Sequence, residues 1–277
     1  MSELESMLAS LERSQQNSQK RNENTNHTAD ADPFHELADN TVTKSNALAR
    51  AYYRFSLVEK RVMEALISKL HPLRTDNQTQ RLELKATEYL KAFPDAGKNA
   101  YTHLAKAGYQ LARKTITTKI ERGGKYSDIP LMSIVTYHEN EGMISYSFNQ
   151  EIIPHLIGLR EKFSSYPLRN AVNFSSSYTW RFYEVLVSWT QPKSQTQGRF
   201  AGWIKRQPVD ELREMLGVPK SYRWTDFEKR VLNVSVKELR EKAQIVVFIE
   251  RVKTSRKITH LNISFIEDEQ IEMKLEN

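Results

Sequence analysis

Basic and amide side chains recur at helical spacing near the C-terminal end of the chain. On a wheel drawn for Thr225–Lys242 at about 100° per residue, they gather within about a third of the circle. The residues on this side are Asp226, Lys229, Arg230, Asn233, Lys237 and Arg240. The residues on the opposite side, expected to face the core, are Phe227, Val231, Val234 and Leu239, with Glu238 among them. A guanidinium can bond guanine O6 and N7 together, and an amide can bond adenine, so this face fits a DNA major groove.

Two residues at the entry of this helix, Arg223 and Trp224, stand where a recognition helix meets base edges. A solvated amphipathic helix would show the same separation of polar from apolar residues, so the segment by itself leaves that alternative open. Four cations follow at the predicted tip of a hairpin formed by Ile245–Arg251 and Lys257–Phe265. They are Arg251, Lys253, Arg256 and Lys257. A tip with this charge suits the phosphate backbone or the minor groove.

A second basic helix is predicted earlier, over Asn99–Glu121. From Lys98 to Lys125 there are seven basic residues and a single acid, a bias beyond the mixed signs of an ordinary surface helix. The residues expected to touch DNA here are Lys106, Gln110, Arg113 and Lys114. Lysine suits phosphate contacts that position a protein without specifying sequence. The next hairpin, Leu131–Tyr137 with Met143–Phe148, has an acidic tip and is predicted to serve a protein interface.

The charge of the chain is unevenly spread. Residues 1–45 carry a net charge of −4, so the +7 of the 277-residue chain leaves +11 on residues 46–277. A body this basic favours a polyanion as its partner. No run approaches the about 20 apolar residues that span a bilayer, no secretory pattern opens the chain, and no cysteine is present. We therefore expect a soluble cytoplasmic protein without membrane contact.

Sequence patterns for catalysis are missing. No G-x-x-x-x-G-K-[ST] phosphate loop occurs, and the seven histidines form neither H-x-H nor H-E-x-x-H pairs. We expect no metal, no cofactor and no enzymatic activity. An alternative from another class is a nicking enzyme that uses a tyrosine, and the missing metal ligands argue against it.

Twelve residues from Arg61 to Pro72 are repeated from Arg181 to Pro192, and Arg, Glu, Leu, Ser and Pro coincide at a constant offset of 120. Each copy predicts an amphipathic helix, and Ser56 with Glu59 forms a capping box before the first. Each copy is followed by a strand and a helix, predicted at Arg81–Leu84, Thr87–Phe93, Arg199–Ile204 and Val209–Leu216. A basic helix and a hairpin come next in both halves. This is the order of a winged helix, whose third helix usually reads the major groove.

The predicted fold class is α+β, with two tandem winged-helix domains related by internal duplication. The first spans residues 44–162 and is expected to contact phosphates and to dimerise. The second spans residues 163–277 and is expected to be the main sequence-specific reader of DNA. Residues 1–43 are predicted to be a flexible acidic and polar tail, because the run Ser14–Thr28 cannot bury a core. Aromatic residues such as Tyr53 and Trp180 are expected to pack in the core rather than stack on bases.

The chain resembles the Rep_3 family, the initiator proteins of iteron-controlled plasmids. The resemblance covers about Lys44–Phe265, and its most specific part is Tyr178-x-x-Arg181-x-Tyr183-Glu184-x-Leu186. Further parts occur in the family's order, at Asn46–Arg50, Phe55–Arg61, Phe148–Leu159, Phe163–Leu168, Leu212–Gly217 and Phe227–Leu232.

The resemblance implies a plasmid replication initiator that binds repeated origin sites, called iterons, as a monomer. It also implies a homodimer that represses its own promoter at an inverted-repeat operator. The implied partners are the host initiator, the replicative helicase and chaperones, in the cytoplasm of a bacterium. In the family the third helix of the second domain enters a major groove, which corresponds to Arg223–Arg240 here. A winged-helix transcriptional repressor without a replication role remains an alternative, because its DNA surfaces would be the same.

Overall fold

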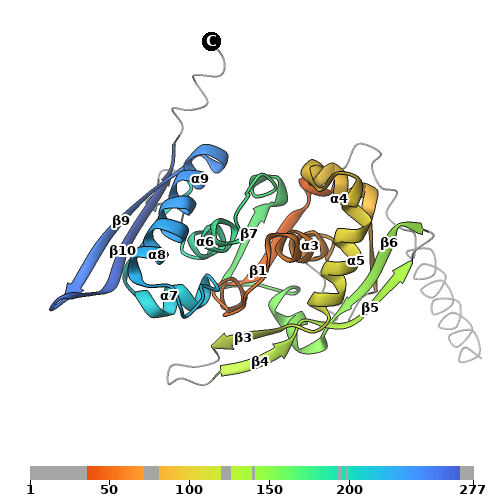
Figure 1. Cartoon of the computed structure of the whole chain (residues 1–277), viewed down its shortest axis with the longest axis horizontal. Coiled ribbons are helices and arrows are strands. Elements are labelled where there is room, and N and C mark those ends of the chain that lie inside the picture. Colours follow the sequence, from red (N-terminus) through yellow and green to blue (C-terminus); the bar gives the residue numbers. More distant parts are fainter. Residues whose placement is uncertain are drawn as a thin grey trace, which may run out of the picture. The chain divides into compact units, whose positions relative to one another are not determined.

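The computed structural model describes residues 36–71, 81–119, 126–138, 141–192, 195–196 and 199–268 (Figure 1). The predicted tail up to residue 35 lies outside this range, as do residues 139–140 of the acidic hairpin tip. Within the described ranges, no helix combines the length and the apolar character that crossing a bilayer requires.

The first winged helix contains three helices and a sheet with the strand order β2-β6-β5. Its elements are α3 (Leu57–Ser68), β2 (Leu82–Lys85), α4 (Ala86–Ala92), α5 (Ala100–Leu111), β5 (Met132–His138) and β6 (Met143–Phe148). The predicted capping box before α3 is confirmed, since the Ser56 N–H donates to Glu59 at 2.6 Å and the Glu59 N–H donates to Ser56 Oγ at 3.3 Å. The helix predicted over Thr87–Phe93 begins one residue earlier, at Ala86. Lys85 is the cap of α4, and its N–H donates to the Glu88 carboxylate at 3.0 Å.

The second winged helix repeats this order around a sheet with the strand order β8-β10-β9. Its elements are α6 (Ser177–Val187), β8 (Ala201–Pro208), α7 (Val209–Met215), α8 (Trp224–Phe227), η7 (Glu228–Leu232), α9 (Asn233–Ala243), β9 (Ile245–Thr254) and β10 (Lys257–Glu267). The segments α8, η7 and α9 follow one another directly and together form the third helix, in which η7 is π-helical. The β9–β10 hairpin extends well beyond the helices (Figure 1).

Short elements outside the repeat complete the fold. The strand β1 (Thr41–Ser45) pairs antiparallel with β7 (Phe163–Pro167). Val42 of β1 is fully buried, so residues 36–43, which the sequence assigned to the flexible tail, belong to the fold. The remaining short helices are η1 (Leu37–Asp39), α2 (Asn46–Ala49), η2 (Pro94–Asn99), η4 (Gln150–His155) and η5 (Leu168–Asn170).

The helix predicted over Asn99–Glu121 is wrong in its second half. Helix α5 ends at Leu111, and a strand β3 (Thr115–Lys119) follows that pairs with β4 (Tyr126–Pro130). Each residue of the run Thr115-Ile-Thr-Thr118 is branched at Cβ, which favours extended backbone over helix. A second hairpin therefore stands where the sequence predicted the end of a helix.

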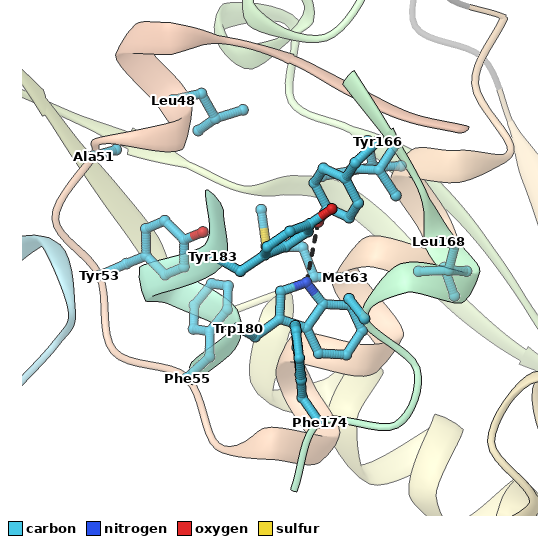
Figure 2. Packing of buried hydrophobic residues seen from close by; sticks show 14 of the residues in the cluster. Leu48, Ala51, Tyr53, Phe55, Met63, Tyr166, Leu168, Phe174, Trp180 and Tyr183 are labelled. Atoms are coloured by element: carbon cyan, nitrogen blue, oxygen red, sulfur yellow. Dashed lines mark hydrogen bonds between the residues drawn. The ribbon is translucent and has the colours of Figure 1, made fainter. Parts of the chain in front are cut away.

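Helices α3 and α6, the two copies of the repeat, are buried on nearly every side. Nine consecutive residues of α6, from Thr179 to Val187, are buried, although the sequence predicted one solvated face. Figure 2 shows Trp180 within this core, where its Nε1 donates to the Tyr166 hydroxyl at 3.0 Å and Phe174 packs beside it. The predicted packing role of these aromatic residues is confirmed. The charged residues that coincide in the two copies, Arg61 with Arg181 and Glu64 with Glu184, are consequently interior groups.

The turn after α7 brings the chain close to another backbone segment. Gly217 has a φ of +67°, and a Cβ added there would lie 2.6 Å from the Tyr53 carbonyl oxygen. We expect Gly217→Ala to lower the free energy of unfolding by more than about 1 kcal/mol, because alanine at a positive φ is strained even without a clash. Gly142→Ala is the control, since Gly142 has a φ of +58° and open space around it. If urea unfolding shows the same loss of unfolding free energy for Gly217→Ala and Gly142→Ala, the close approach to Tyr53 does not contribute.

Candidate nucleic-acid interface

The third helix of the second winged helix exposes a row of basic and amide side chains. The exposed members of the predicted face are Lys229, Arg230, Asn233, Lys237 and Arg240. Phe227, Val231 and Leu239 are buried on the other side, as predicted, and Asp226 is half-buried. The surface therefore has the composition that base reading requires. The contact of these side chains with DNA stays a prediction.

One core position of this helix is predicted wrongly. Val234 is 42% exposed, whereas Leu232 and Ser235 are buried. The buried residues of α9 are Ser235, Glu238 and Leu239, so the side that faces the core does not include Val234. Val234 therefore lies on the outer face, where it adds an apolar group to the basic and amide side chains.

Hydrogen bonds hold the third helix against the segment that precedes α6. Ser175 donates to Glu238 Oε1 from its backbone N–H and from its hydroxyl, each at 2.6 Å. Lys242 Nζ donates to the same oxygen at 2.6 Å. Burial alone would raise the pKa of Glu238, but the hydrogen bonds from Lys242 and Ser175 outweigh it and lower the pKa below its ordinary value. The ionised carboxylate thus anchors the third helix to the fold.

Two of the exposed cations have partners on the same helix. Arg230 Nε lies 3.4 Å from Asp226, and its guanidinium carbon lies 5.6 Å from the ring centroid of Tyr222. Lys237 Nζ lies 3.8 Å from Glu241. Ion pairs exposed to this degree are weak, so either cation can exchange its carboxylate for a phosphate or a base edge.

The wing, which is the β9–β10 hairpin, carries cations at its tip and further along β9. The exposed cations at the tip are Lys253, Arg256 and Lys257. Arg251, also predicted to bind DNA, forms an ion pair with Glu228 of η7, and its guanidinium carbon lies 6.0 Å from the ring centroid of Trp224. This pair joins β9 of the wing to the third helix, so the two basic elements are adjacent in space.

Helix α5 of the first winged helix presents a smaller basic face. Lys106 is exposed and Gln110 is half-buried. Arg113, just beyond the helix, is also exposed. Its guanidinium donates to the Tyr109 carbonyl at 2.9 Å and lies 3.5 Å from the ring centroid of that residue. The tyrosine ring thereby holds the guanidinium at the surface.

Lys114 does not lie on the helix face that the sequence predicted, because α5 ends three residues before it. Its Nζ donates to Glu59 Oε2 at 3.0 Å and to the Arg54 carbonyl at 2.9 Å. The ammonium is therefore bound within the fold, and a phosphate contact would have to replace these bonds.

The β5–β6 hairpin and the possible metal ligands complete the description of the site. Glu141, beside the acidic tip of the β5–β6 hairpin, is exposed, and His138 Nδ1 lies 3.9 Å from it. In the part of the chain that the structure describes, no cluster of three histidine, aspartate or glutamate side chains is arranged to hold a metal.

Two regions of the chain match models of one protein family. Residues 41–187 match the model described as "Initiator Replication protein, WH1", and residues 208–265 match "Initiator Rep protein, WH2". This chain belongs to the Rep_3 family of initiator replication proteins. The predicted α+β fold with two winged helices is confirmed, because the WH1 and WH2 matches follow one another in the expected order.

Individual relatives agree with this membership. The PI protein of Escherichia coli is 27% identical to this chain over 161 residues, which cover 51% of this chain and 50% of that protein. The match therefore spans about half the length of that relative. A crystal structure described as Pi initiator protein in complex with iteron DNA has a TM-score of 0.68 at 20% identity, covering 84% of this chain and 99% of that one. At this identity the likeness shows the fold of the Rep_3 winged helices.

Proposed function

We propose that this chain is a plasmid replication initiator that binds repeated origin sites through its two winged helices. The observation that carries the proposal is the exposed basic and amide face of α8–η7–α9, to which the Glu228–Arg251 pair joins a basic wing. Membership in the initiator family supports the replication role, and the Pi initiator of similar fold was crystallised with iteron DNA. The proposed action is binding, with no catalytic step.

The two winged helices are proposed to divide the work. In the second, Arg230 and Asn233 offer the forked and amide donors that read guanine and adenine, and Val234 offers a contact for a thymine methyl. In the first, Lys106 and Arg113 are proposed to hold phosphates. We place the division between the two domains, residues 44–162 and 163–277, at residue 162. The third helices would enter successive major grooves, with centres about 34–36 Å apart.

We further propose a homodimer that represses the chain's own promoter at an inverted repeat. The first winged helix would supply the dimer surface, and its acidic hairpin suits a protein contact better than a phosphate contact. The host initiator, the replicative helicase and chaperones are the proposed protein partners, in the cytoplasm of the bacterium that carries the plasmid.

A minimal plasmid that carries only this gene and its upstream repeats tests the replication role. We expect the plasmid to be maintained in a host without another initiator, and to be lost when a stop codon interrupts the gene. If the plasmid is lost although the purified protein still protects the repeats from nuclease, the repressor alternative is favoured. Metal-dependent cleavage of supercoiled origin DNA would instead favour the nicking enzyme.

Replacing Lys106 and Arg113 together by alanine should weaken binding to all DNA sequences alike. Each lost phosphate contact reduces the slope of log K against log salt by about 0.9, so we expect the slope to fall by about 1.8. Fluorescence anisotropy titrations between about 50 and 200 mM salt measure it. Arg169→Ala with Lys205→Ala, which removes two exposed cations elsewhere, should leave the slope unchanged. The phosphate-holding role would be contradicted by equal slopes for both double variants.

A further inference from the structure

Five charged side chains meet in the interior where α3 and α6 face each other. This group, here called the ionic core, consists of Lys44, Lys60, Glu64, Arg181 and Glu184. Lys44 comes from β1, two members come from α3 and two from α6. None of the five side chains is more than 4% exposed. Charges this deeply buried are costly unless each of them is paired and hydrogen-bonded.

The two lysines of the ionic core each bridge both carboxylates. Lys44 Nζ lies 2.7 Å from Glu64 Oε2 and 2.5 Å from Glu184 Oε1. Lys60 Nζ lies 2.6 Å from Glu64 Oε1 and 2.7 Å from Glu184 Oε2. The Arg181 guanidinium donates to Glu184 Oε2 at 2.6 Å. Every carboxylate oxygen of the ionic core therefore has at least one cationic donor.

Two tyrosine hydroxyls close the shell around these carboxylates. The Tyr166 hydroxyl lies 3.1 Å from Glu64 Oε2 and 3.1 Å from Glu184 Oε1, and the Tyr53 hydroxyl lies 3.4 Å from Glu184 Oε2. Burial alone would raise the pKa of Glu184, but Lys44, Lys60 and Arg181 outweigh it and hold that pKa well below its ordinary value. The carboxylate therefore stays ionised inside the fold.

The ionic core lies at the junction of the duplicated halves. Glu64 and Glu184 occupy the same position in the two copies of the repeat, 120 residues apart. Like charges placed together repel, so the two helices can meet here only with both ammonium groups between the carboxylates. A slide of one helix by a single turn, about 5.4 Å, would leave buried charges without partners. An apolar interface would tolerate small slides, whereas the ionic core permits one register.

A continuous packed path connects the ionic core to the two predicted reading helices. Helix α3 packs on α5 in the first winged helix, and α6 packs on α9 in the second. The Thr179 hydroxyl of α6 lies 3.5 Å from that of Ser235 on α9, and Ser175 holds Glu238 of the same helix. A shift between α3 and α6 would therefore be transmitted to the distance between α5 and α9.

We propose that the ionic core is a positioning device that sets the spacing between the two DNA sites read by α5 and by α8–η7–α9. Its residues are buried, and they act by joining α3 to α6 through Lys60–Glu184 and through Lys44, which pairs with both carboxylates. The spacing role rests on the proposed function, while the positional role of the core is a property of the protein alone. The two parts can therefore be tested separately.

The spacing role can be tested with origin repeats that carry one extra base pair between the two contacted segments. One base pair moves the second segment by about 3.4 Å and turns it by about 35°. We expect the wild-type protein to lose at least about 30-fold in affinity, because both helices can no longer enter their grooves together. The Glu184→Gln variant should bind the native repeat more weakly than the wild-type protein does. Its loss of affinity when the base pair is inserted should be only about threefold or less, because the two winged helices can then adjust independently.

Two further variants keep this test decisive. Tyr166→Phe removes only the hydroxyl that lies against both carboxylates, so this variant should fold. Its loss of affinity when the base pair is inserted should lie between the losses of the wild-type protein and of Glu184→Gln. Glu88→Gln makes the same chemical change in a partly exposed pair within the first winged helix, where Lys69 Nζ lies 2.9 Å away, and should behave as wild type. Thermal unfolding followed by circular dichroism checks that each variant is folded. If the folded core variants keep the wild-type loss on insertion, the proposal is wrong.

Distance measurements test the positional role without DNA. The chain has no cysteine, so Thr102→Cys on α5 and Glu241→Cys on α9, both at exposed positions, allow two spin labels to be attached specifically. We expect one narrow distance distribution in the otherwise wild-type protein and a broader one when Glu184→Gln or Tyr166→Phe is added. Broadening without any binding to the repeats would overturn the proposed function and leave the positional role standing. A distribution that stays narrow in both variants would overturn the positional role.

Discussion

Replacing Lys229, Arg230 and Lys237 together by alanine is expected to abolish sequence-specific binding to the origin repeats. All three side chains are exposed on α8–η7–α9, and neither surface ion pair there is strong enough to withhold a cation from DNA. A good base contact contributes about 1–3 kcal/mol of discrimination, so the affinity for the repeats should fall by more than about 100-fold. Nuclease footprints and anisotropy titrations on repeat and scrambled DNA measure the change.

A matched variant separates this loss from a general effect of charge. Arg160, Arg169 and Lys205 are exposed cations outside the third helices and the wing, and replacing them removes the same total charge. This control should lower the affinity for repeat and scrambled DNA by the same small factor. If both triple variants weaken repeat binding equally, the third helix of the second winged helix is not the reader. A further single variant, Val234→Ala, should reduce discrimination only at a thymine position.

Trp180→Ala is expected to cause the largest loss of stability among single substitutions. Trp180 is fully buried between Phe93 and Phe174, whose ring centroids lie 6.3 Å and 6.2 Å from its own. Truncation of such a residue leaves a large cavity and lowers the free energy of unfolding by about 3–5 kcal/mol. It also removes the Nε1 donor from Tyr166, whose hydroxyl lies against the carboxylates of the ionic core. Denaturation by urea, followed by circular dichroism, measures the loss.

Trp203 provides the comparison for this stability prediction. It lies on β8 and is 44% exposed, so Trp203→Ala should cost well below the loss at Trp180. A similar loss at both positions would show that the core around α6 tolerates a cavity. In that case α6 would not be the central packing element of the second winged helix.

Much of the fold could be predicted because the signals are local. The capping box of Ser56 and Glu59 starts α3, and Gly217 lies just past the end of α7 at a positive φ. The alternation of apolar and polar residues along the strands predicted the β5–β6 and β9–β10 hairpins. The polar face of the third helix was also visible in advance, since a helix of this kind separates polar from apolar residues at 3.6-residue spacing.

Other features depended on contacts between distant residues. The strand β3 forms because Thr115–Lys119 pairs with β4, and the wheel drawn through it as a helix misplaced Lys114. The strand β1 is ordered by β7, in which Tyr166 pairs with Val42 across more than a hundred residues. Val234 is exposed because the side of α9 that packs on α6 and β9 carries Ser235, Glu238 and Leu239.

The sequence by itself determined the duplication, the basic character of the surfaces and the family, because these are properties of residue types and their order. Only the tertiary structure decided which charged residues face solvent and which are interior. Glu64 and Glu184 looked like polar positions of amphipathic helices, yet Lys44, which lies 20 and 140 positions from them, joins them in the core. The environment of a charge is set by whatever the fold brings next to it, and residues so far apart leave no local pattern.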